Sequence, residues 1–198
     1  GPAVGSRREV ARIVKQIRQR WPDVVIILRG DSGFCADELL TWCEANHVDY
    51  VVGVARNQRL EGLIEGPLAE AKQQFEATQQ PARIFVEFEH KTLKGAWNKD
   101  RRVVAKAEHI NGKANPRFVV TSLNAERWEK KALYEDLYCG RGDMENRIKE
   151  QFVLFADRVS VSTMRGNQQR IYLSVIAYTL MNDLRRLGLK TTKMATAQ

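Results

Sequence analysis

Residues that form covalent or metal cross-links are scarce in this sequence. It has three cysteines and three histidines among 198 residues. The cysteines, Cys35, Cys43 and Cys139, are odd in number and lack paired metal-ligand spacing, so we expect neither a disulfide framework nor a zinc site. The histidines are scattered and form no ligand pattern. A reducing cytoplasm is the natural setting for such a chain.

Long apolar runs are also missing. No stretch is long and apolar enough to cross a membrane, no secretory leader is present, and we expect no membrane partner. With 43% hydrophobic residues, the chain can bury one sizeable core with a small appended subdomain. The net charge of +8 and the isoelectric point near 9.6 favour a polyanionic partner, without identifying that partner as DNA.

A carboxylate follows an apolar run in the first part of the chain. Residues 24–28 are five consecutive apolar residues, a pattern typical of a strand buried on both faces of a sheet. Asp31 comes just after this predicted strand, at its carboxyl end, where open α/β sheets place their ligand chemistry. The alternative is that Asp31-Ser-Gly is a turn and helix cap without a chemical role.

A second motif combines one carboxylate with several cations. If residues 138–149 form one helix, steps of three, four and four residues line up the side chains of Tyr138, Arg141, Glu145 and Lys149. A carboxylate between two permanent cations suits a site that handles phosphate. The alternative is a solvated salt-bridge ladder, which stabilises an exposed helix by only about 0.3–0.5 kcal/mol per pair.

Together, the two motifs resemble a known family. Leu28-Arg-Gly-Asp31-Ser-Gly-Phe34 and Tyr138-Cys-Gly-Arg141-Gly-Asp-Met-Glu145-Asn-Arg-Ile-Lys149 are similar to the second-aspartate and glutamate motifs of DDE-type transposases of bacterial insertion sequences. The chain most resembles the insertion-sequence thirteen-eighty group, within the class that has a ribonuclease H-like core and a Tyr-Arg-Glu-Lys signature. The resemblance covers most of the chain, including Val48-Asp-Tyr-Val-Val-Gly-Val-Ala-Arg-Asn57.

The resemblance implies catalytic roles for two carboxylates. Asp31 matches the second and Glu145 the third carboxylate of the Asp-Asp-Glu triad, and both are therefore expected metal ligands. The implied cofactor is Mg²⁺, for which Mn²⁺ can substitute. Two such ions activate a water or a 3′-hydroxyl and stabilise the leaving oxygen in an in-line displacement at phosphorus.

The resemblance also implies DNA contacts. Tyr138, Arg141 and Lys149 match signature positions that hold the DNA backbone near the transposon end. One departure is that the class places its Lys seven residues after the Glu, where this chain has Phe152. The implied partners are DNA, both as transposon ends and as target, and a second copy in the full-length protein, in a bacterial cytoplasm close to the nucleoid.

The first Asp of the triad is not found. In the family it lies on the first strand of the core, but residues 7–20 show helical spacing, and Asp23 and Asp49 precede their strands and would lie at the opposite sheet end. The chain also begins with Gly1-Pro2 and not with Met, as after a protease cut. We therefore expect a truncated catalytic core, inactive as it stands, that binds metal weakly or not at all.

The expected fold is α/β: a ribonuclease H-like mixed sheet flanked by helices, interrupted by a β-rich insertion and lacking the N-terminal strands of the core. The expected parts are residues 1–57 for the first part of the core, 58–123 for the insertion and 124–198 for the helical part with the catalytic Glu. Strands are predicted at 50–54, 84–88, 102–106 and 118–121, and Asn111-Gly112 is a favourable hairpin turn. The final helix, about 167–187, is expected to contribute core residues, among them Leu173, Ile176 and Leu180.

Three further residues of the insertion are candidates for DNA binding. Trp97 lies among cations that include Arg101 and Arg102, and an aromatic ring beside cations can stack on an unpaired base while the cations hold phosphates. Related transposases use an insertion-domain Trp in this way when DNA ends form hairpins. The alternative is that Trp97 covers the small β-subdomain.

Three classes of function remain open. The first is a transposase catalytic core that cuts and joins DNA by metal-assisted phosphoryl transfer, incomplete in this chain. The second is a DNA-binding or regulatory fragment without catalysis, which would tolerate the loss of Asp31. The third is an unrelated metal-dependent nuclease that uses Asp31 and Glu145 alone.

Overall fold

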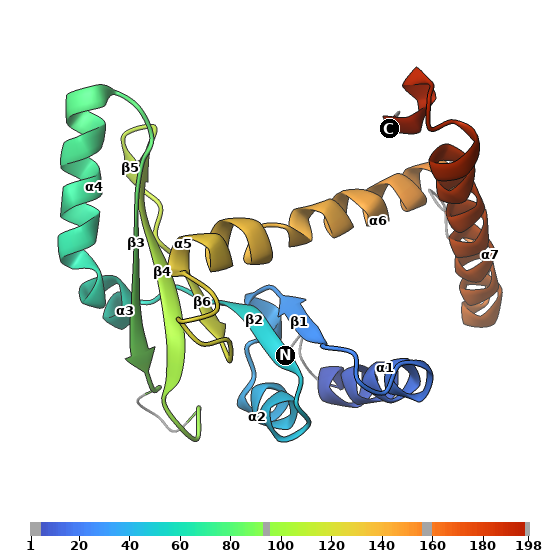
Figure 1. Cartoon of the computed structure of the whole chain (residues 1–198), viewed down its shortest axis with the longest axis horizontal. Coiled ribbons are helices and arrows are strands. Elements are labelled where there is room, and N and C mark those ends of the chain that lie inside the picture. Colours follow the sequence, from blue (N-terminus) through green and yellow to red (C-terminus); the bar gives the residue numbers. More distant parts are fainter. Residues whose placement is uncertain (1–4, 93–95, 156–159, 197–198) are drawn as a thin grey trace. The chain divides into compact units, whose positions relative to one another are not determined.

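The computed structural model describes residues 5–92, 96–155 and 160–196 (Figure 1). Its chain divides into two compact units, Gly1–Arg141 and Gly142–Gln198, and each unit is described by itself. The first unit is built around one sheet, and the second consists of helices. Within the described residues, no helix is both long and apolar enough to cross a membrane.

The first unit is a mixed sheet with helices. Its strands are β1 (Ile27–Gly30), β2 (Asp49–Val54), β3 (Ala82–His90), β4 (Arg101–Ile110), β5 (Lys113–Ala114) and β6 (Arg117–Thr121). The order across the sheet is β1-β2-β6-β4-β3, with β5 paired to β4; β1 and β2 are parallel and the other pairs antiparallel. The expected mixed sheet flanked by helices is therefore confirmed.

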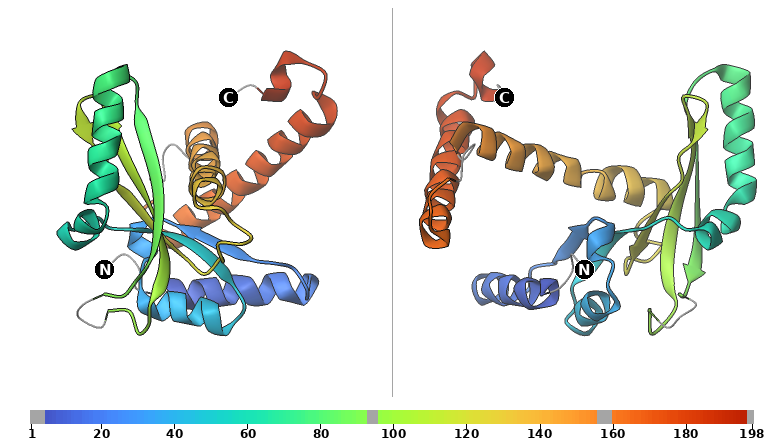
Figure 2. Two further views of the ribbon diagram at one scale, coloured as in Figure 1. Left: turned by 60° about the vertical axis from the view of Figure 1, so that its left-hand side comes forward. Right: turned by 180° about the vertical axis from the view of Figure 1, so that it is seen from behind.

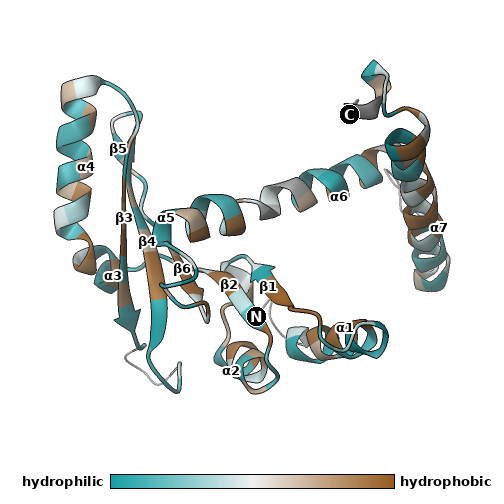
Figure 3. Cartoon of the chain, in the orientation of Figure 1, coloured by the Kyte–Doolittle hydropathy of each residue, from teal (hydrophilic) through white to brown (hydrophobic). Residues whose placement is uncertain are grey.

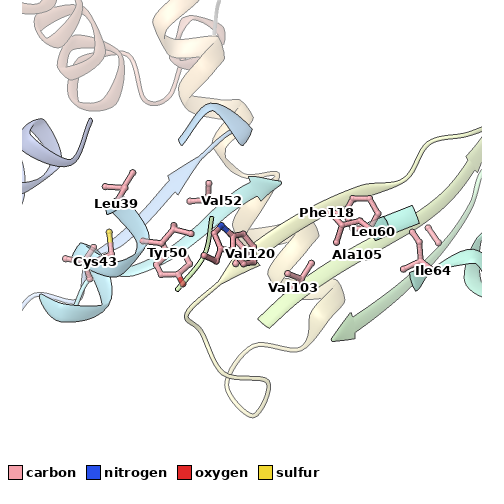
Figure 4. Packing of buried hydrophobic residues seen from close by; sticks show 14 of the residues in the cluster. Leu39, Cys43, Tyr50, Val52, Leu60, Ile64, Val103, Ala105, Phe118 and Val120 are labelled. Carbon is pink, nitrogen blue, oxygen red and sulfur yellow. The ribbon is translucent and has the colours of Figure 1, made fainter. Parts of the chain in front are cut away.

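Helices cover one face of this sheet. They are α1 (Ser6–Arg20), α2 (Asp37–Ala45), α3 (Gln58–Leu63) and α4 (Glu65–Thr78), and α4 runs alongside β3 and β4 (Figure 2). Leu40 and Cys43 of α2 and Leu60 of α3 pack with inward-facing strand residues such as Tyr50, in the larger of the two cores (Figure 4). Because side chains alternate along a strand, the same strands also supply a second face.

The second face carries a smaller core. Val51, Val104 and Val119 come from three neighbouring strands and pack against Leu133 and Tyr134. The latter two lie on η2 (Leu133–Tyr138), a π-helical turn that follows the short helix α5 (Lys130–Ala132). This packing holds the segment that leads to the glutamate motif against the sheet.

Most predicted elements are present, with two local differences. Asn111 and Gly112 both have positive φ, 51° and 71°, and join β4 to β5, which confirms the predicted tight hairpin turn. The helical region after β2 consists of two helices, because α3 ends at Leu63 and α4 starts again at Glu65. Pro67 in the first turn of α4 explains the break, since its ring excludes the preceding helical turn.

The strand before Asp31 is shorter than predicted. β1 begins at Ile27, and Val24 and Val25 are exposed, Val25 by 63%. The residue pairs between β1 and its neighbour β2 begin at Ile27, and before them the Ile26 carbonyl still accepts a hydrogen bond of 2.9 Å from the Asp49 N–H. The expectation of a strand buried on both faces over 24–28 was therefore wrong.

The strands of residues 58–123 belong to the same sheet as β1 and β2. β6 pairs directly with β2, and β4 and β3 follow it. The expected division into a core, an insertion and a helical part at residues 57 and 123 stays a prediction.

The second unit contains α6 (Arg141–Phe155, whose first residue belongs to the first unit), α7 (Met164–Asp183), η3 (Leu184–Gly188) and η4 (Lys193–Thr196). Polar contacts join α6 and α7: Gln151 donates to Ser174 over 3.0 Å, and Tyr178 donates to Glu150, also over 3.0 Å. Apolar residues recur along α7 (Figure 3), and several of them are exposed, Leu180 by 65%. The expectation that Leu173, Ile176 and Leu180 are core residues was wrong, because the polar side of α7 is the side that contacts α6.

Candidate active site

Asp31 lies where the sequence predicted it, at the carboxyl end of β1. Its exposed side chain caps the short 3₁₀ helix η1 (Ser32–Phe34), because Oδ1 accepts a hydrogen bond of 2.9 Å from the Gly33 N–H. The capping alternative is therefore part of the structure. It does not compete with a chemical role, since a carboxylate can accept a backbone hydrogen bond and still offer oxygen lone pairs to another group.

At Gly53 of β2, the turn that carries Asp31 and the side chain of Tyr138 come close to the strand. A Cβ placed on Gly53 would lie 2.6 Å from the Tyr138 hydroxyl and 3.1 Å from the Ser32 backbone nitrogen. It would also lie 3.3 Å from the carbonyl carbon of Asp31. The Tyr138 hydroxyl and the Asp31–Ser32 peptide are thus neighbours, although more than a hundred residues separate them in the sequence.

Tyr138 is held in this place by contacts of its own segment. Its half-buried ring packs on that of Tyr134, with 5.4 Å between the ring centroids. The backbone N–H of Cys139 donates to the Tyr134 carbonyl over 2.9 Å, the five-residue step of a π-helical turn. Such turns are frequent at functional sites.

Arg29 of β1 ties the end of η2 to the sheet. Its Nη1 donates a hydrogen bond of 2.9 Å to the Leu137 carbonyl. Arg29 lies two residues before Asp31, so the two side chains start from the same face of the strand. A Cβ on Gly140 would lie 3.1 Å from Arg29 Nη1 and 2.6 Å from the Asp136 carbonyl, so this junction is tightly packed.

The four residues of the second motif do not share one regular helix. Tyr138 ends the π-helical turn, a two-residue turn follows, and α6 begins at Arg141. Arg141, Glu145 and Lys149 keep the predicted spacing of four residues on α6. The side chain of Arg141 is outside the described part of the structure.

Glu145 and Lys149 belong to the second unit, where both are exposed. The carboxylate next along this helix, Glu150, is bound by Tyr178 and Arg185. The Arg185 hydrogen bond is the main reason that the pKa of Glu150 lies below its ordinary value. Glu150 therefore stabilises the pairing of α6 and α7, and the role of Glu145 as a metal ligand stays a prediction.

Trp97 is placed in the interior of the first unit. Its side chain is 3% exposed and belongs to the larger core, and His90 packs edge-on against it with 5.9 Å between centroids. The guanidinium of Arg101 lies over the ring, 5.6 Å from its centroid. This placement favours the alternative in which Trp97 covers the β-structure, and it leaves the predicted stacking on a base without support.

The two arginines are also engaged in the described structure. Arg101 has a 1% exposed side chain, which donates to Asp37 and to Glu44, each over 2.8 Å. Arg102 donates to the Leu123 and Trp128 carbonyls, over 2.7 and 2.9 Å, and pairs with Glu87. These contacts give both side chains a structural role and leave their predicted contact with DNA phosphates without support.

A cavity of about 750 Å³ opens at the other end of the sheet. Asp49, at the start of β2, lines it together with Glu44 and Arg101. Asp31 follows the last residue of the parallel strand β1, so this cavity does not contain the candidate site.

The donors available for a metal ion are carboxylate oxygens, which are the ligands that Mg²⁺ prefers. In the parts of the chain that the structure describes, no group of three or more His, Cys, Asp or Glu side chains could hold a metal ion. The carboxylate oxygens of Asp31 and Glu145 are of the type that binds Mg²⁺. Asp31 belongs to the first unit and Glu145 to the second.

Two residues with a place in this site were missed by the sequence analysis, namely Arg29 and Gly53. Both lie inside motifs that carry the family resemblance, one beside Asp31 and the other in the predicted strand 50–54. A glycine in the middle of an apolar strand was the available signal, since such a glycine often marks a close approach of another group.

The sequence of the chain is similar to that of a known protein family. The whole chain, residues 1–198, matches the family described as transposase DDE domain group 1. No curated protein matches the chain.

Proposed function

Because the chain belongs to the transposase DDE domain family, group 1, we propose that it supplies the second and third catalytic carboxylates of a bacterial insertion-sequence transposase, Asp31 and Glu145. The family generally uses divalent metal ions. The observation that carries the proposal is the position of Asp31 at the carboxyl end of β1, beside the Tyr138 hydroxyl.

In this proposal some residues of the site would bind metal ions, and others would contact the DNA backbone. Divalent ions held by Asp31 and Glu145 would activate the attacking oxygen and stabilise the leaving oxygen at phosphorus. The cap from the Gly33 N–H keeps the Asp31 carboxylate in one orientation. The Tyr138 hydroxyl, fixed beside the Asp31–Ser32 peptide, would donate to a phosphate oxygen, and Arg141 and Lys149 would hold the backbone of the transposon end.

Several finer points of the proposal come from the resemblance. They are the membership of the insertion-sequence thirteen-eighty group, Mg²⁺ as the resident metal, a location near the nucleoid, and a homodimer in the full-length protein. The first Asp, expected upstream, and the inactivity that its loss would cause stay predictions. Dimer formation can be tested by substituting the exposed leucines of α7, Leu173 and Leu180.

The test is Mn²⁺-dependent nicking of supercoiled plasmid by the chain, beside Asp31→Asn and Glu145→Gln. Mn²⁺ is chosen because it tolerates an incomplete ligand set. Asp49→Asn is the matched control, because it removes a carboxylate at the opposite end of the sheet that also accepts a hydrogen bond, here from Ser122 over 2.9 Å. If the parent chain nicks DNA with Mn²⁺, both site variants are expected to abolish the nicking and the control to retain it, and the expected inactivity of the chain is then wrong.

Two other outcomes decide between the alternatives. Nicking that survives Asp31→Asn contradicts the catalytic role of Asp31. DNA binding without nicking by any version supports the truncated transposase core with its expected inactivity. Restoring an upstream segment then separates it from the second candidate function, a DNA-binding or regulatory fragment, which would stay inactive.

A further inference from the structure

Gly53 stands at an unusual position for a glycine. It is buried in the interior of β2, between Val52 and Val54, where a residue without a side chain weakens a strand. Its φ is not in the left-handed region, so its backbone conformation does not require a glycine. The remaining reason for a glycine at this position is that a side chain would not fit between its neighbours.

The Tyr138 hydroxyl takes up that space. A Cβ on Gly53 would approach this oxygen to 2.6 Å, which is closer than real Cβ contacts allow. The Ser32 nitrogen, at 3.1 Å from the same point, is backbone and cannot swing away as a side chain can. An alanine would thus push Tyr138 away from the turn that carries Asp31.

Arg29 and the aromatic packing limit where Tyr138 can move. The hydrogen bond from Arg29 to the Leu137 carbonyl pins the backbone just before Tyr138, and the ring of Tyr134 lies against its ring. These two contacts restrain the backbone and one ring face of Tyr138. Its hydroxyl then lies close to the Asp31–Ser32 peptide, next to Gly53, which has no side chain there.

We propose that Gly53 is a positioning residue, whose missing side chain sets the Tyr138 hydroxyl beside the Asp31 turn so that both can act on one phosphate group. The inference rests on the proposed function, because it assigns Gly53 a part in the same site. Gly53 acts through Tyr138 and does not itself touch the DNA.

The first test is a double-mutant cycle of thermal stability with Gly53→Ala and Tyr138→Phe. Overpacking by Gly53→Ala is expected to lower the melting temperature by several degrees, roughly 2–10 °C. In the Tyr138→Phe background the loss is expected to be at most about half as large, since the phenyl ring lacks the oxygen that the new methyl group meets. Gly62→Ala is the matched control: in the described structure no atom lies within 4 Å of its added Cβ. We expect that variant to keep or raise the melting temperature.

The second test measures position and not stability. With labelled tyrosines, Mn²⁺ bound at Asp31 is expected to broaden the ring signals of Tyr138, assigned by their loss in Tyr138→Phe, and Asp31→Asn is expected to abolish the broadening. Gly53→Ala is expected to shift the Tyr138 signals without metal and to reduce their Mn²⁺ broadening at least twofold. Gly62→Ala is expected to change neither.

The outcomes separate the inference from the function. Equal losses of melting temperature in both backgrounds, or Tyr138 signals that Gly53→Ala leaves unshifted and equally broadened, overturn the positioning role while the function stands. If Mn²⁺ broadens no tyrosine signal in the parent chain, metal binding at Asp31 fails, and the cycle together with the metal-free shift of Tyr138 still decides the role of Gly53. If Gly53→Ala does not fold but Gly53→Ala/Tyr138→Phe does, that rescue supports the inference; if neither folds, the inference is overturned.

Discussion

The guanidinium of Arg29 donates a hydrogen bond of 2.9 Å to the backbone carbonyl of Leu137. This contact joins the strand that ends at Asp31 to the π-helical turn that ends at Tyr138. In the described structure it is a direct polar link between the first motif and the residue that precedes the second motif.

Loss of this link is expected to loosen η2. Arg29→Met should lower the free energy of unfolding by about 0.5–1.5 kcal/mol. It should also speed amide hydrogen exchange at Cys139, whose N–H closes the π-helical turn. Arg18→Met is the control, because Arg18 likewise donates to backbone carbonyls, those of Asn46 and His47. Equal exchange rates at Cys139 in both variants would contradict the link.

Asp31 caps η1 and is also the proposed metal ligand, and substitutions can separate these two roles. Asp31→Asn preserves an oxygen for the Gly33 N–H, so its free energy of unfolding should stay within about 0.5 kcal/mol of the parent. Asp31→Ala removes the cap and should cost about 0.5–2 kcal/mol. Urea denaturation distinguishes them, and a large loss with Asp31→Asn would show that the charge itself stabilises the turn.

Arg101 is predicted to be a structural residue. Arg101→Met should cost about 3–5 kcal/mol, because it removes the nearly buried cation shared by Asp37 and Glu44, and the more exposed Lys99, 3.1 Å from Glu44, compensates only one of the two carboxylates. Arg12→Met removes an exposed pair with Glu9 and should change stability by at most about 0.5 kcal/mol. Chemical denaturation gives both values. A folded, equally stable Arg101→Met protein with weaker DNA binding would instead restore the DNA role expected from the sequence.

Stability should fall on acidification in part through Glu108. Burial alone would raise the pKa of this carboxyl, but hydrogen bonds from Lys106, Arg83 and Asn115 outweigh it and hold the pKa below the ordinary 4.5. A lowered folded-state pKa stabilises the fold above pH 4.5, and the contribution is lost as the pH falls through the folded-state value.

Glu108→Gln should therefore lower the free energy of unfolding at neutral pH by about 1–3 kcal/mol and flatten its decline between about pH 5 and pH 3. Asn115→Ala removes one of the three hydrogen-bond donors and should have a smaller effect in the same direction. Urea denaturation at several pH values measures this. An unchanged slope in Glu108→Gln would show that other carboxylates dominate the acid transition.

The hairpin between β4 and β5 depends on backbone conformation. Gly112 has φ of 71°, and no atom of the described structure lies within 4 Å of a Cβ placed there, so Gly112→Ala should cost about 1 kcal/mol through backbone strain alone. Gly66→Ala, in α4 and equally uncrowded, should be neutral or stabilising. Thermal melts of the two variants should move in opposite directions, and a shared direction would contradict this account.

Local signals in the sequence predicted much of the fold. The periodicity of residues 7–20 predicted α1, and the apolar run 50–54 predicted the buried strand β2. Asn111-Gly112 predicted the hairpin, because few residue pairs adopt positive φ at two successive positions. These features depend on near neighbours in the chain and can therefore be read from a single sequence.

Other expectations failed because tertiary packing decides them. Residues 24–28 are apolar enough for a central strand, yet Val25 is exposed, since the described ladder begins at Ile27. Leu180 has the hydropathy of a core residue, but the side of α7 that contacts α6 is the polar one. The DNA-stacking role of Trp97, expected from the cations near it in the sequence, stays a prediction, although folding buries its ring among apolar side chains.

The sequence by itself determined the family and the position of Asp31 after a strand, because ordered motifs and local periodicity are properties of the chain. The catalytic roles of Asp31 and Glu145 stay predictions from the sequence. The tertiary structure alone decided that Tyr138 lies beside the Asp31 turn, that Arg29 holds its segment, and that Gly53 leaves the space. These contacts join residues far apart in sequence, and they form only when the sheet brings β1, β2 and η2 together.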